Sequence, residues 1–198
     1  MAQIKINATY GLTGTLPAVS GANLTTLNAS NISSGTLNAS RYVDNEGGIT
    51  NSQIWLLTSD LSTTGDSSYA DITANLAESG VTGYARIGSA MTVSSGIFTF
   101  PATGYWSVRA EYNFEGSDRY GQGQILVTTN NSSYAVVAVA NGESDNHEYL
   151  NFSLETQIDV TSTTNVKCKF QQGGTVATLM GSSSYMRTGF IFTRLGDT

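Results

Sequence analysis

The sequence is poor in charged residues, which make up 12% of its 198 residues, and poorer still in positive charge. Nine lysines and arginines stand against fifteen aspartates and glutamates, so the formal net charge is −6. Nucleic-acid binding depends on basic side chains that neutralise phosphates, and anionic lipid surfaces attract the same side chains. We therefore expect neither nucleic acid nor a membrane among the partners.

The chain also has only one cysteine, Cys168, and one histidine, His147. A single cysteine excludes an intrachain disulfide, and one cysteine with one histidine cannot complete a structural zinc site. Cys168 stands in an alternating stretch, which predicts a small apolar residue on a strand. His147 is the only candidate histidine base, and no Gly-x-Ser-x-Gly sequence accompanies it. We expect no cofactor, no metal site and no catalytic residue.

Long apolar runs are missing as well. No segment approaches the roughly 20 apolar residues that a membrane-spanning helix requires. The first five residues, Met1 to Lys5, are not followed by an apolar run, so they do not resemble a signal peptide. We expect synthesis in a cytoplasm without export.

The first fifty residues contain a short internal repeat. The sequence Leu-Asn-Ala-Ser occurs at 27–30 and again at 37–40, and large apolar residues fall at a spacing of five. This spacing matches neither a helix nor a strand, and such sparse apolar residues cannot offset the ordering entropy of a lone chain. We expect residues 1–52 to form an extended, irregular arm ordered by other chains, with a floppy linker or a short solenoid as alternatives. The residues expected to anchor this arm are Leu27, Ile32, Leu37 and Tyr42.

Residues 53–198 form a second region that reads as a series of short strands. Residues 105–114 alternate between polar and apolar, and the apolar positions from Trp106 to Phe114 form one inward face. Shorter runs of the same kind follow as far as residue 195, separated by turn signals such as 172–174. About eight short strands at this spacing predict an all-β domain, a sandwich or jelly roll.

Three acidic residues, Glu143, Asp145 and Glu148, cluster beside His147. Paired carboxylates can cleave glycans, and clustered carboxylate oxygens can bind calcium. The segment has no calcium-loop signature, so we expect a solvated, turn-forming loop and keep both activities as alternatives.

The stretch from Gly96 to Trp106 resembles a phrase of the complement-globular-domain and tumour-necrosis-factor-like jelly rolls. That phrase reads aromatic-x-aromatic-x-x-x-Gly-Tyr-aromatic, with a proline after the second aromatic. Residues 154–170 resemble the late hairpin of these proteins, and residues 185–192 resemble their closing strand. The resemblance spans residues 53–196, although the loops within 115–148 match no part of the pattern.

The resemblance implies a homotrimer, because the jelly rolls of this family pack in threes around an axis. The ten tyrosines, seven phenylalanines and two tryptophans suit such an interface. The alternative is that all of these aromatic residues fill the core of the single chain. The core or interface candidates are Trp55, Phe98, Phe100, Tyr105, Trp106, Tyr185, Phe190 and Phe192.

The repeat tract, over residues 11–42, resembles tracts of tailed-phage fibre proteins. An arm of this kind before a trimeric jelly roll predicts a structural virion protein at the virion surface, a fibre or capsid decoration (cement) subunit. Its arm would contact other virion proteins of the capsid, neck or tail. The main alternative is an adhesin that binds a host-surface glycan, with Tyr120 and Tyr134 as candidate contacts. A glycan-cleaving enzyme is the third hypothesis, and we expect no enzymatic activity.

Overall fold

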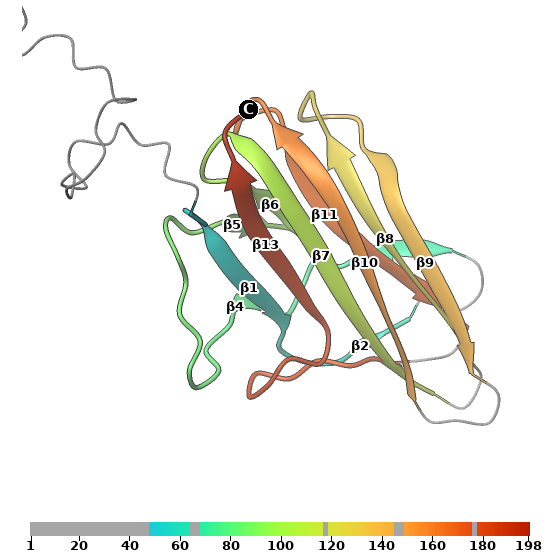
Figure 1. Cartoon of the computed structure of the whole chain (residues 1–198). Helices are drawn as coiled ribbons and strands as arrows, with labels where there is room; N and C mark the ends of the chain where they lie inside the picture. The colour runs from blue at the N-terminus through green and yellow to red at the C-terminus, as the bar shows by residue number, and fades with distance from the viewer. Residues whose placement is uncertain (1–47, 64–67, 117–118, 145–148, 176–177) are drawn as a thin grey trace, which may run out of the picture. The chain divides into compact units, whose positions relative to one another are not determined.

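The structure, a computed structural model, describes residues 48–63, 68–116, 119–144, 149–175 and 178–198 (Figure 1). The chain divides into two units, residues 1–46 and 47–198, and only the second is described. The arm-anchoring candidates Leu27, Ile32, Leu37 and Tyr42 lie outside the described residues. Within the described ranges there are strands and no helices, which confirms the predicted all-β class.

Sheet A is antiparallel, with the strand order β2-β12-β7-β13-β1-β4. The remaining strand, β10, pairs with β7 along its whole length and forms the sheet edge there. The strands of sheet A are β1 (Ser52–Leu57), β2 (Leu61–Ser62), β4 (Leu76–Glu78), β7 (Gly104–Glu115), β10 (Tyr149–Val160), β12 (Thr178–Leu179) and β13 (Gly189–Gly196).

Sheet B is also antiparallel, with the order β5-β6-β11-β8-β9 and β3 paired to β11. The chain crosses repeatedly between the two sheets, and among the described strands only the pairs β1–β2, β5–β6, β8–β9 and β12–β13 are consecutive strands of one sheet, which gives the sandwich its jelly-roll connections (Figure 1). The strands of sheet B are β3 (Tyr69–Asp71), β5 (Thr92–Ser94), β6 (Ile97–Thr99), β8 (Arg119–Thr128), β9 (Ala135–Ser144) and β11 (Lys167–Gly174).

The core lies between the sheets and is largely aromatic. The predicted inward face of β7 is confirmed, since every even-numbered residue from Trp106 to Phe114 is buried. Phe98 of β6 and Phe170 of β11 meet Phe190 and Phe192 of β13 from the opposite sheet, and the rings of Phe170 and Phe190 stack at 4.0 Å. Aromatic pairs of this kind add stability beyond the apolar area they bury.

The corner before β7 follows the sequence phrase closely. Strand β6 ends at Thr99, two residues before Pro101, and Gly104 has a φ of 131°. A Cβ at Gly104 would lie 2.4 Å from the carbonyl oxygen of Gly196, so only glycine fits. The indole Nε1 of Trp106 donates to the carbonyl of Ala102 at 3.2 Å, which closes the corner.

Tyr112 connects the two sheets through its hydroxyl group. The hydroxyl lies 2.9 Å from the carbonyl oxygen of Gln171 and 3.2 Å from that of Gln124, on neighbouring strands of sheet B. Burial raises the pKa of Tyr112, so the phenol keeps the proton that it donates. Gly123 makes room for the ring, because a Cβ there would lie 2.6 Å from a ring carbon of Tyr112.

Replacing Tyr112 with phenylalanine removes this bond and leaves the ring in place. We expect Tyr112→Phe to lower the free energy of unfolding by about 1–1.5 kcal/mol. Urea unfolding followed by circular dichroism measures this as a lower midpoint with an unchanged slope. The matched control is Tyr105→Phe on the exposed face of β7, for which we expect a change within about 0.5 kcal/mol. Equal losses in the two variants would show that the buried hydroxyl contributes nothing.

Candidate functional site

The outer face of sheet A, which points away from the core, is mostly polar. On β7 the odd-numbered residues lie on this face, and Ser107 donates to Glu155 of β10 at 2.7 Å. Arg109 forms an ion pair with Glu111 on the same strand. These groups already have partners, and the exposed ones contribute little to stability. The polar side chains in the middle of this face therefore pair with one another within the chain.

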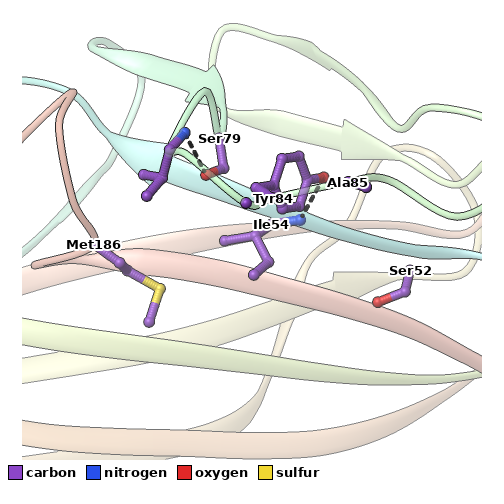
Figure 2. Close-up of a pocket in the computed structure, with 8 residues that line it drawn as sticks. Ser52, Ile54, Ser79, Tyr84, Ala85 and Met186 are labelled. Carbon is purple, nitrogen blue, oxygen red and sulfur yellow. Dashed lines mark hydrogen bonds between the residues drawn. The ribbon is translucent and has the colours of Figure 1, made fainter.

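At the β1 end of the same face, the residues after β4 form a pocket of about 390 Å³ (Figure 2). Its floor comes from Ser52 and Ile54, which alternate with inward-facing residues of β1. Met186, from the segment before β13, contributes a third side. Most of the exposed lining is apolar, so the pocket suits an apolar group better than a charged one. The full lining is Ser52, Ile54, Ser79, Val81, Gly83, Tyr84, Ala85 and Met186.

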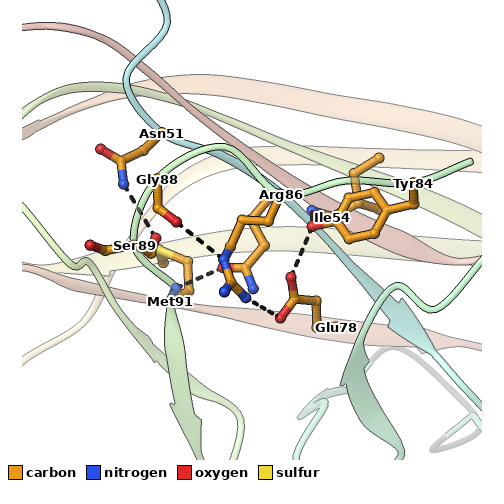
Figure 3. Close-up of polar contacts among 9 residues, drawn as sticks. Asn51, Ile54, Glu78, Tyr84, Arg86, Gly88, Ser89 and Met91 are labelled. Carbon is orange, nitrogen blue, oxygen red and sulfur yellow. Dashed lines mark hydrogen bonds and ion pairs between the residues drawn. The ribbon is translucent and has the colours of Figure 1, made fainter.

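Hydrogen bonds hold the pocket wall against β1 (Figure 3). The backbone N–H of Ile54 donates to the Tyr84 hydroxyl at 3.2 Å, and that hydroxyl lies 3.2 Å from Oε1 of Glu78. Arg86 binds the other carboxylate oxygen of Glu78 at 2.6 Å. Burial raises the pKa of Tyr84, and the charge of Glu78 raises it further while the Ile54 bond acts the other way. The phenol therefore keeps its proton and can donate to Glu78.

The far end of the wall is fixed by amide side chains from the start of β1 (Figure 3). Nδ2 of Asn51 donates to the carbonyl of Ser89 at 3.2 Å, and Oε1 of Gln53 accepts from the N–H of Met91 at 2.6 Å. Gly88 passes so close that a Cβ there would lie 2.2 Å from the carbonyl oxygen of Thr50. The pocket is thus formed in the single chain and needs no partner to shape it.

At the opposite edge of the sandwich, β9 is an edge strand that carries exposed valines. In the described part of the chain, β9 pairs only with β8, and β10 of the other sheet lies near its far side without pairing with it. Val136, Val137 and Val139 are exposed, Val139 by 58%. The register shift opposite Ile125 and Leu126 places one extra residue in this stretch of β9. An apolar edge of this kind invites association with another chain.

The outer face of sheet B carries Tyr120 and Tyr134, the two candidates for glycan contact. Tyr120 lies on β8 opposite Glu143, and its hydroxyl accepts a hydrogen bond from Asn141 at 3.0 Å. Nζ of Lys169 lies 4.8 Å from the centre of the Tyr134 ring. The two tyrosines therefore share one face of the sandwich, a relation that the sequence did not reveal.

Most of the aromatic candidates for core or interface lie in the core of the single chain. Tyr105 and Tyr185 are the exceptions, with exposed fractions of 45% and 52%. Tyr185 precedes the closing strand, since β13 begins only at Gly189. The surplus of aromatic residues is thus taken up mainly by one core. The six buried candidates are Trp55, Phe98, Phe100, Trp106, Phe190 and Phe192.

The acidic cluster is only partly described. Glu143 is exposed on β9, whereas Asp145, His147 and Glu148 lie outside the described residues. Cys168 is buried on β11, as its alternating sequence predicted, and burial raises the pKa of its thiol. In the ranges that the structure describes, no three histidine, cysteine, aspartate or glutamate side chains gather as metal ligands. The same ranges contain no helix that is long and apolar enough to cross a membrane.

No local pattern in the sequence predicts the pocket. Its wall has no strong periodicity, and its key residue, Tyr84, stands between Gly83 and Ala85 in a stretch without a recognised motif. The one available signal was the pair of oppositely charged residues Glu78 and Arg86, which the fold brings together. The apolar run at residues 134–139, which contains the exposed valines, predicts a strand, but the place of that strand at a sheet edge depends on long-range pairing.

No protein-family model matches the sequence, and no curated protein is significantly similar to it. Among solved structures, murine APRIL at pH 5.0 matches with a TM-score of 0.53 and 10% identity, over 73% of this chain and 98% of its own. Eiger TNF from S. frugiperda matches with a TM-score of 0.54 and 10% identity, over 76% of this chain and 96% of its own. The PRD1 vertex protein P5 matches with a TM-score of 0.47 and 14% identity, over 76% of this chain and 100% of its own. At these identities the similarity to APRIL and Eiger concerns the fold alone, and the chain has the tumour-necrosis-factor-like jelly-roll fold that its sequence motifs predicted.

Proposed function

We propose that this protein is a non-enzymatic structural subunit of a bacteriophage virion and that it acts as a homotrimer. The main evidence for a trimer is a pair of apolar surfaces at opposite edges of the sandwich. One edge presents the exposed valines of β9, and the other presents the pocket over β1. A contact between two different patches of identical chains forms a closed ring when the rotation between neighbours closes. The family resemblance of the jelly-roll motifs implies three copies in that ring.

In this arrangement the valine edge of one subunit packs against the pocket side of the next. Val136, Val137 and Val139 supply branched aliphatic side chains, and Ile54, Val81 and Met186 supply the apolar walls that receive them. The contact therefore depends on aliphatic residues, because most of the aromatic ones already fill the core. Covering β9 also removes the exposed edge that would otherwise promote uncontrolled aggregation.

The virion assignment depends on the repeat tract, which resembles tracts of tailed-phage fibre proteins. Residues 1–52 would attach the trimer to capsid, neck or tail proteins through Leu27, Ile32, Leu37 and Tyr42, and the jelly roll would project as a knob at the virion surface. A fibre subunit and a capsid decoration subunit both fit this description.

Two measurements on the full chain test the proposal. Light scattering coupled to size-exclusion chromatography at micromolar concentration should give the mass of three chains, and a folded monomer would contradict the trimer. Antibodies against this chain should label purified virions in electron micrographs, at the head, the neck or the tail. Virions without any label would contradict the virion assignment and leave the trimer unaffected.

A further inference from the structure

A strip of hydrogen-bonding side chains crosses the outer face of sheet B. Asp71 of β3 lies opposite Gln171 of β11, and Gln171 lies opposite Gln124 of β8. Asn141 of β9 continues the strip one row further along the strands. These side chains point away from the core, since the next residue of β8, Ile125, is fully buried between the sheets. We call these four residues the amide strip.

Three of the four side chains of the amide strip, those of Asp71, Gln171 and Asn141, are held in position by hydrogen bonds before any ligand arrives. Asp71 accepts hydrogen bonds from Nζ of Lys169 at 2.8 Å and from Nε2 of Gln171 at 2.7 Å. Burial by itself raises the pKa of Asp71, but these two bonds and the charge of Lys169 outweigh burial and lower it. The carboxylate is therefore charged at neutral pH and balanced by Lys169. Fixed side chains lose little conformational entropy on binding.

An aromatic ring stands near each end of the strip. Tyr134 packs on Lys169, which lies opposite Leu126, and Tyr120 lies six residues away from Leu126 along β8. Six residues of strand span about 20 Å. Between these ends, the side-chain amide of Gln124 makes no hydrogen bond with any described residue and remains available to a ligand.

We propose that the amide strip and its two tyrosines bind an uncharged oligosaccharide. Sugar hydroxyl groups both donate and accept hydrogen bonds, as amides do, and a carboxylate accepts from two of them. The apolar C–H face of a sugar ring packs on an aromatic ring, and the two tyrosines provide such rings at this site. Because Lys169 neutralises Asp71 at one end of the strip and the other three members are uncharged amides, the strip itself has no net charge that would favour an ionic ligand.

This binding function goes beyond the structural role proposed above, and its site differs from the pocket. The row through Gln171 and Gln124 ends at Val139 on β9, so the strip would lie beside the subunit boundary of the trimer. Three strips on one trimer would strengthen binding to a repeating polysaccharide through multivalency. The bound sugar would then be a component of a bacterial surface polysaccharide.

The test uses the full chain on an array of neutral hexose and N-acetylhexosamine oligosaccharides, followed by calorimetry with the oligosaccharide that binds best. We expect Gln124→Ala and Tyr134→Ala each to weaken binding about fivefold or more, because each removes one direct contact. Tyr134→Phe keeps the ring and should bind within about twofold of the original chain. The control Thr92→Ala, an exposed residue of β5 on the same sheet, should leave affinity unchanged.

All variants are compared by light scattering and thermal melting, so that loss of the trimer is not mistaken for loss of the site. Absence of binding to every neutral oligosaccharide of the array would overturn the proposal. Binding that Gln124→Ala and Tyr134→Ala both leave unchanged would also overturn it, because the sugar would then occupy another surface. Neither result would affect the homotrimer, which is measured independently by mass.

Discussion

A chain carrying both Val137→Asp and Val139→Asp is expected to be a folded monomer at micromolar concentration. Both valines are exposed on an edge strand, so the carboxylates meet water in the single chain and leave its core intact. In the proposed trimer each carboxylate would be buried against Ile54, Val81 and Met186 without a charged partner. An unpaired buried charge costs several kcal/mol, and the ring contains three such contacts. Light scattering measures the mass, and circular dichroism checks the β-sheet content.

The pocket can be blocked from the other side of the same contact. Ala85 is an exposed residue of the pocket lining, and Ala85→Trp should fill the space that receives the neighbouring valines. We expect this variant to dissociate as well. The matched charge control is Thr103→Asp, at an exposed residue of the turn before β7 that belongs neither to β9 nor to the pocket lining. If both aspartates at β9 leave the mass of three chains unchanged, the valine edge is not the subunit contact.

The strands and the inward face of the core were predictable from sequence because they depend on local patterns. The alternation of polar and apolar residues from Trp106 to Phe114 predicts which face of β7 is buried. The motif around Gly104 predicts the turn before β7. The six buried aromatic candidates could be named for the same reason, although their sequence did not decide between core and subunit interface. Whether an aromatic residue lies in the core or at a subunit interface depends on how much space there is between the two sheets. The core of this sandwich holds more aromatic side chains than we expected of one small core.

The pocket and the amide strip depend on contacts between distant parts of the chain. Glu78 and Arg86 meet only because the segment between them folds back over β1. Asp71 and Lys169 are 98 residues apart and meet through the pairing of β3 with β11. Tyr120 and Tyr134 were candidates because they are aromatic residues flanked by polar ones. They share one face because β8, which carries Tyr120, pairs with β11, and the Tyr134 ring lies over Lys169 of β11. Local sequence patterns carry no information about such pairings.

Replacing Phe98 with alanine is expected to cause the largest loss of stability of any single change in the core. Phe98 is 0% exposed, and its ring lies 5.1–6.0 Å, between ring centres, from four other aromatic rings. These rings belong to Trp55, Phe170, Phe190 and Phe192, which come from both sheets. Removing the ring leaves a cavity at the point where the sheets meet, at a cost of about 3–5 kcal/mol. Urea unfolding at one fixed protein concentration measures the loss, since association of subunits in the proposed trimer would also contribute to stability.

Two further variants separate this packing effect from the loss of an aromatic residue as such. Phe98→Leu keeps most of the buried volume and should cost about 1–2 kcal/mol, because the four neighbouring rings keep contact atoms on that side. Tyr105→Ala removes an aromatic ring that is 45% exposed, and we expect a loss within about 0.5 kcal/mol. The order of the three losses is the decisive result. If Phe98→Ala cost no more than Tyr105→Ala, the aromatic cluster would not hold the two sheets together, and the packing of the sandwich would depend on its aliphatic residues instead.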